Sequence, residues 1–101
     1  MNIKEEDLHF SEEFYDALCE LKLVHLTGIK KYKKNDWKTR SRAEHYSHAI
    51  DHLKQAVTLG IESDLHGKAA EEAPEKKAAL NEEISHAIIR LMMFYQQRLE
   101  M

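Results

Sequence analysis

The chain contains one proline and three glycines in 101 residues, so few of its residues would interrupt a helix. Apolar residues recur three and four positions apart over three long stretches, which is the spacing of amphipathic α-helices. Alternation typical of a β-strand and internal repeats are not evident in the sequence. We therefore expect an all-α fold in a single domain, residues 1–101. It should be a small bundle of three long helices, completed by oligomerisation, most simply as a dimer.

Residues with capping preferences predict where the first helix begins and ends. Ser11 is a suitable N-cap, because Glu12 and Glu13 follow it in what would be the first turn. The helix is expected to weaken at Gly28, with one further turn to Tyr32 as an extension.

The other two helices have their own boundary signals. The second is expected to begin near Ser41 and to end at Gly60, and the third has Pro74 at its first helical position. A polar, alanine-rich connector, residues 61–73, separates them. The residues expected to face the core are Phe14, Ala17, Leu18, Leu21 and Val24 in the first helix, Tyr46, Ala49, Ile50, Leu53, Ala56 and Val57 in the second, and Leu80, Ile84, Ala87, Ile88, Leu91 and Tyr95 in the third.

Composition limits the compartment and the partners. A single cysteine, Cys19, excludes an intramolecular disulfide and fits a reducing compartment. The sequence has no stretch of transmembrane length, and its acidic start lacks the apolar region of a signal peptide. The net charge is −3, and one small basic patch neutralises few phosphates. We therefore expect a cytoplasmic protein, in the host cell if the protein is viral, with neither a membrane nor a duplex nucleic acid as its partner.

A basic segment with two aromatic residues gives the strongest indication of function. Residues 28–42, GIKKYKKNDWKTRSR, carry seven positive side chains and one negative, so the segment is +6 and the remainder of the chain is −9. Such asymmetry attracts anionic ligands. Tyr32 and Trp37 offer flat faces on which a base can stack. A nucleotide combines both features, whereas the alternative is a solvated charge run at a helix end.

Histidines and a glutamate on the second and third predicted helices are candidate ligands for a metal ion. An E-x-x-H pair that faces a row of histidines can hold a transition metal in a helical bundle. Alternatively, these histidines lie at the boundary of an amphipathic helix or form hydrogen bonds with a ligand. The residues concerned are His45, His48 and His52 on the second helix, and Glu83 and His86, with Arg90 one turn further, on the third.

Hydrolysis of a phosphoanhydride with Mg²⁺ or Mn²⁺ would require several converging oxygen ligands. Glu13 and Asp16 form an E-x-x-D pair on the first helix, but the other core helices lack an E-x-x-E partner for it. The carboxylate pattern therefore favours binding of a nucleotide over its cleavage.

The segment from Phe14 to Trp37 resembles the opening of the phage-associated dATP/dGTP diphosphohydrolase N-terminal domain family. The family has G-x-K-K-Y and then a tryptophan five residues after the tyrosine. His52-Leu53, Glu62 to His66, and His86-Ala87 are similar to later parts of the family pattern. The residues that match the first motif are Gly28, Lys30, Lys31, Tyr32 and Trp37.

The resemblance implies an all-α protein that handles purine nucleotides, with Mg²⁺ or Mn²⁺ as the metal of a hydrolytic member. This sequence departs from the family at Asp36 and Arg90, where the family has asparagine, and residues 67–81 resemble an insertion. A cation at Arg90 can neutralise phosphate without a metal. These departures bear on hydrolysis more than on nucleotide binding.

Three hypotheses follow for the function. The first is capture of a phosphate-bearing purine nucleotide without cleavage, the second is metal-dependent nucleotide pyrophosphohydrolysis, and the third is a helical protein-interaction module. The number of phosphates, and whether the nucleotide is linear or cyclic, stay open. The residues expected to bind the nucleotide are Lys30, Lys31, Tyr32, Lys34, Trp37, His48, His52 and Arg90, and the candidate metal ligands are Glu83 and His86.

Overall fold

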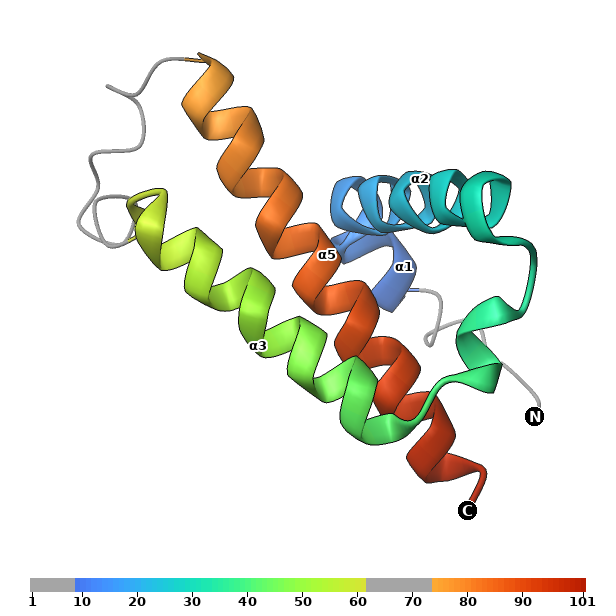
Figure 1. Ribbon diagram of the computed structural model, residues 1–101. Helices are drawn as coiled ribbons and strands as arrows, with labels where there is room; N and C mark the ends of the chain where they lie inside the picture. Colours follow the sequence, from blue (N-terminus) through green and yellow to red (C-terminus); the bar gives the residue numbers. More distant parts are fainter. Residues whose placement is uncertain (1–8, 62–73) are drawn as a thin grey trace.

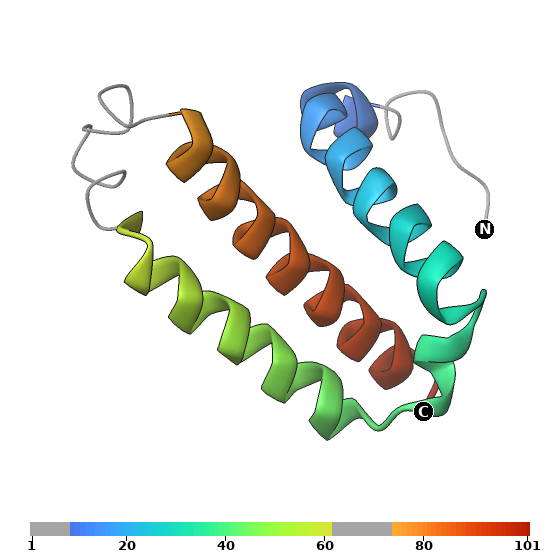
Figure 2. The same cartoon turned by 45° about the horizontal axis from the view of Figure 1, so that its top comes forward.

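The computed structural model describes residues 9–61 and 74–101, and within these ranges its regular elements are helices. α3 and α5 run antiparallel and side by side, and α2 packs on the other side of α5 (Figures 1 and 2). The predicted all-α fold with three long helices is confirmed for the described residues. The elements are α1, His9–Glu13; α2, Tyr15–Tyr32; the 3-10 helix η2, Asp36–Thr39; α3, Arg42–Thr58; and α5, Pro74–Leu99.

The predicted ends of α3 and the start of α5 are confirmed. The Ser41 hydroxyl accepts a hydrogen bond from the backbone N–H of Glu44 at 3.1 Å, as an N-cap does. After α3 ends, Gly60 has φ of +92°, a conformation that glycine adopts without a steric penalty. Pro74 is the first residue of α5, where its missing N–H leaves no hydrogen bond unmade.

The predicted start of the first helix is wrong. Ser11 lies inside α1, and a bend at Phe14 separates α1 from α2. Helical hydrogen bonds continue on both sides of the bend, from Phe14 N–H to Phe10 O at 3.2 Å and from Leu18 N–H to Phe14 O at 2.8 Å. The Phe10 and Phe14 rings also contact each other, with centroids 5.1 Å apart. These contacts extend the helical segment ahead of the serine.

α2 also passes through Gly28 without a break and ends at Tyr32, so the one-turn extension is part of the helix. A glycine inside a helix costs only about 1 kcal/mol relative to alanine. The hydrogen bonds of the turns on either side of Gly28 outweigh that cost, and the helix therefore continues.

The core between α3 and α5 is built mainly from small side chains. Among the described residues, the buried apolar ones are Ala49, Ala56, Ala87 and Leu80. Alanines at a helix contact allow the two backbones to approach closely. The core positions predicted at these four residues are confirmed. Others predicted to face the core are exposed instead, namely Phe14, Ala17, Tyr46, Leu53, Val57, Ile88, Leu91 and Tyr95.

The described helices include none that is both long and apolar enough to cross a membrane. Apart from Ile61, the predicted connector lies outside the described residues, as does the similarity noted at Glu62 to His66.

Candidate functional site

A cavity of about 330 Å³ lies where α2, η2, α3 and α5 meet. It combines cationic, aromatic, histidine and apolar side chains with one carboxylate. Its charged residues are Lys33, Arg40, Arg90 and Asp36; its aromatic residues are Tyr32 and Trp37; its histidines are His25, His48 and His86; and Val24, Ile29, Ile89 and Met93 supply apolar surface.

The cavity brings together some of the residues predicted from the sequence and leaves others outside. Tyr32, Trp37, His48 and Arg90 line it, and so does His86, which was predicted as a metal ligand. The predicted ligand contacts that do not line the cavity are Lys30, Lys31, Lys34 and His52, together with the predicted metal ligand Glu83.

Four polar residues of the cavity, His25, Lys33, Asp36 and Arg40, were not among the predicted site residues. Lys33 and Arg40 belong to the basic segment, but charge alone does not show which of its seven cations face inward. His25 lies on α2, one turn before Gly28 and Ile29, so it shares their face of the helix. This spacing is the sequence feature from which His25 could have been predicted as a site residue.

Two residues with positive φ connect α2 to η2. Asn35 has φ of +67°, a left-handed conformation that asparagine tolerates. Lys33 has φ of +82° and ψ of +151°, a region that is populated almost only by glycine. Such a conformation costs on the order of 1–3 kcal/mol in a residue with a side chain. Lys33 is therefore strained, and it is strained at the edge of the cavity.

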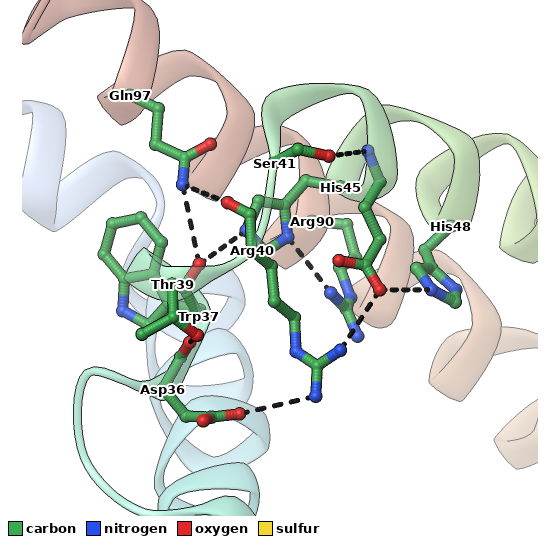
Figure 3. A network of polar contacts seen from close by, with 10 residues as sticks. Asp36, Trp37, Thr39, Arg40, Ser41, His45, His48, Arg90 and Gln97 are labelled. Atoms are coloured by element: carbon green, nitrogen blue, oxygen red, sulfur yellow. Dashed lines mark hydrogen bonds and ion pairs between the residues drawn. The ribbon is translucent and has the colours of Figure 1, made fainter.

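Hydrogen bonds to main-chain carbonyls fix η2 against the helices (Figure 3). The Trp37 carbonyl accepts a hydrogen bond from His45 Nε2 at 2.8 Å, and Gln97 Nε2 lies 3.5 Å from the same oxygen. Gln97 Nε2 also donates to the Arg40 carbonyl at 2.9 Å. η2 is thus tied to both α3 and α5, which holds the Trp37 indole beside the cavity before any ligand arrives.

His45 links this loop to Arg90. It is fully buried, and its Nδ1 lies 3.0 Å from a guanidinium nitrogen of Arg90. Because a guanidinium only donates, Nδ1 must accept, and the proton must be on Nε2, which donates to Trp37. Burial lowers the pKa of His45, although the bond to the Trp37 carbonyl opposes this. The folded protein therefore favours the neutral ring that the network requires.

The two arginines of the cavity are close enough to repel each other. Burial lowers the pKa of Arg90, and the neighbouring charge of Arg40 lowers it further. Arg40 is itself held by carboxylates, 3.1 Å from Glu44 and 3.6 Å from Asp36 (Figure 3). His48 Nε2 lies 3.9 Å from the same Glu44 oxygen. An anion between the two guanidinium groups would relieve their repulsion.

The predicted metal ligands have a different environment. Glu83 Oε2 lies 2.7 Å from His52 Nδ1 and so ties α5 to α3, while the His52 and His86 rings lie 5.2 Å apart. Within residues 9–61 and 74–101, no three histidine, cysteine, aspartate or glutamate side chains are grouped so as to hold a metal ion. This arrangement does not fit Mg²⁺ or Mn²⁺, which take several oxygen ligands. The metal assignment of Glu83 and His86 stays a prediction.

The cavity can therefore bind an anion through charge-assisted hydrogen bonds from its cationic side chains, and a flat ring through its aromatic side chains. Comparisons of this chain with protein-family models, with curated proteins and with solved structures found no match.

Proposed function

We propose that this protein captures a phosphate-bearing purine nucleotide in the cavity between α2, η2, α3 and α5 without cleaving it. The observation that supports this proposal is the shared cavity itself, in which Arg40 and Arg90 lie with the rings of Tyr32 and Trp37. A phosphate and an aromatic base are the two halves of one ligand that would use both groups.

The phosphate would be held by the cations. Arg90 already directs one guanidinium nitrogen to His45, and its remaining N–H groups are available to an anion. Lys33 and Arg40 add two further positive charges, against the carboxylate of Asp36 in the lining and that of Glu44, which contacts Arg40. Each charge-assisted contact contributes roughly 1.5–3 kcal/mol. His25, His48 and His86 line the same cavity from α2, α3 and α5 and are further hydrogen-bonding groups.

The base would stack on an aromatic face. Trp37 is held by its carbonyl and by an edge contact with His45, whose ring centroid is 6.1 Å away. Stacking of a base on an aromatic side chain contributes roughly 1–3 kcal/mol. A cavity of about 330 Å³ lies at the lower end of the range of about 300–1,000 Å³ for small-molecule sites. A single nucleotide is therefore favoured over a nucleic-acid strand.

The resemblance to a phage-associated family extends the proposal to the biological setting. The protein would act in the cytoplasm of an infected host cell and deplete a free purine nucleotide there. It would act as a homo-oligomer, because the described helices bury few large apolar side chains.

Incubation of the protein with dATP, dGTP, their monophosphates and a cyclic purine mononucleotide, with Mg²⁺ or Mn²⁺ present, tests capture against turnover. We expect at least one of these ligands to bind in calorimetry and to be recovered intact by chromatography after the protein is denatured. Release of pyrophosphate or monophosphate in excess over the protein would instead support the pyrophosphohydrolase alternative. If none of them bound at millimolar concentration, a protein-interaction module would be the better account.

Lys33 provides a test in which stability and binding should change in opposite directions. Lys33→Gly removes the strained side chain, so we expect the free energy of unfolding to rise by about 1 kcal/mol. The same change removes a cation from the cavity, so nucleotide affinity should fall. Denaturant titration and calorimetry on one preparation measure both effects.

Lys31→Ala is the matched control, because Lys31 belongs to the same basic segment but lies outside the cavity lining. It should leave affinity nearly unchanged. Equal loss of affinity in the two variants would show that general charge, and not the cavity, attracts the ligand.

A further inference from the structure

One face of the α3–α5 hairpin is apolar and exposed, and it lies away from the cavity. On α5 the cavity is lined by His86, Ile89, Arg90 and Met93. Successive residues of an α-helix are rotated by about 100°, so a second set of α5 residues projects from the opposite side. We name this surface the hairpin face; it comprises Ile88, Leu91, Met92, Tyr95 and Leu99 of α5 with Tyr46, Leu53 and Val57 of α3, each between 38% and 64% exposed.

The two halves of the hairpin face form one continuous surface. The rings of Tyr46 on α3 and Phe94 on α5 lie 5.7 Å apart and join the two stripes. Phe94 also lines a shallow apolar hollow together with Ile88, Leu91, Met92 and Tyr95. On α3, the same rotation per residue places Tyr46, Leu53 and Val57 away from His48, which lines the cavity.

The hairpin face gathers much of the exposed apolar surface of the described residues. Eight of their fifteen exposed large hydrophobic side chains belong to it, each at least 38% exposed. One partner contributes roughly 800 Å² to a stable interface, and contiguous apolar surface of that kind marks a protein contact. The buried apolar residues of the described helices are three alanines and one leucine, so the hairpin has little core of its own.

We infer that the hairpin face is covered by a second copy of this chain, so that two hairpins form a four-helix bundle. Ile88, Met92, Tyr95 and Leu99 are separated by four, three and four residues, which is the spacing of a helix seam that packs against another helix. Because this contact completes the core of the chain, its partner must be present wherever the chain is made. A second copy of the chain is always present there. A two-fold axis also lets the same apolar surface serve both subunits.

This arrangement leaves the cavities on the outer sides of the dimer. Each subunit keeps its own α2, η2, α3 and α5 around its cavity, so two ligand sites per dimer should act independently. The inference does not depend on what the cavity binds.

Sedimentation of the full chain across the micromolar range tests the inference. The wild type should have twice the 11.9 kDa chain mass, and Ile88→Glu with Met92→Glu should reduce the mass to that of one chain and lower the Tm. Leu23→Glu is the matched control, because Leu23 is 60% exposed on α2 and lies outside the hairpin face. It should remain dimeric. A monomeric wild type, or a dimer broken by the control and not by the double variant, overturns the inference.

Cross-linking provides a second measurement that does not rely on a destabilised variant. In a Cys19→Ser background, Met92→Cys should yield a dimer with a thiol-reactive cross-linker, whereas Leu23→Cys should yield monomer. The reverse pattern would place the contact on α2 and would overturn the inference.

Discussion

Arg90→Ala is expected to weaken nucleotide binding by about 10- to 150-fold, which corresponds to the loss of one charge-assisted contact of roughly 1.5–3 kcal/mol. Arg90 is partly buried and one of its nitrogens contacts His45, and unlike Arg40 it has no carboxylate contact among the described residues. Arg90→Lys keeps the charge but loses the planar fork, so we expect an intermediate affinity. Calorimetry with the best ligand of the panel measures the change.

Arg98→Ala is the control for this experiment, because Arg98 lies on the same helix, is exposed and does not line the cavity. Its affinity should match that of the wild type. EDTA should likewise leave the affinity unchanged, because the proposal assigns charge neutralisation to arginine. A large loss of binding with EDTA, with Arg90→Ala nearly normal, would favour the metal-dependent alternative.

His45→Leu is expected to lower the free energy of unfolding by about 1–3 kcal/mol, the range for leaving buried polar partners unpaired. The change removes the acceptor of Arg90 and a donor to the Trp37 carbonyl. Binding should weaken as well, because η2 loses one of its ties. Near-wild-type stability in this variant would show that the network contributes little.

The same residue predicts a pH dependence with a definite sign. The pKa of His45 is lowered in the folded state from an ordinary value of 6.5, so the unfolded chain binds more protons between the two values. The stability due to neutral His45 is therefore complete above about pH 6.5 and declines as the pH falls below that value. Arg90 and Arg40 favour the neutral ring, whereas Glu44 opposes it.

Denaturant titrations between pH 5 and pH 8 measure the slope of the free energy of unfolding against pH. This slope should be smaller in His45→Leu than in the wild type, and unchanged in His9→Gln, because His9 is exposed on α1. An identical slope in all three proteins would contradict the assignment of the effect to His45.

The ends of α3 and the start of α5 could be predicted from local chemistry, whereas the start of the first helix and the orientation of several helix faces could not. Ser41 and Pro74 act on the neighbouring backbone, and both predictions are correct. α5 carries apolar residues on more than one side, and periodicity alone does not show which side meets α3. Ala87 is buried there, whereas Ile88 and Tyr95 are exposed.

The cavity shows a similar division. The basic segment, which its charge and aromatic residues mark in the sequence, supplies Tyr32, Lys33, Asp36, Trp37 and Arg40 to the cavity lining. The contact between His45 and Arg90 joins residues 45 positions apart, and it depends on how two helices pack. His45 was seen as one of a row of histidines, but its complete burial has no local signal in the sequence.

The way η2 is held has a consequence for how the site could change over time. His45 and Gln97 bind the loop through main-chain carbonyls, and every amino acid at those positions supplies the same oxygen. The Trp37 and Arg40 side chains can therefore vary without loss of these anchors. A lineage under pressure to recognise a different ligand could exchange them one at a time, while the inherited loop geometry persists.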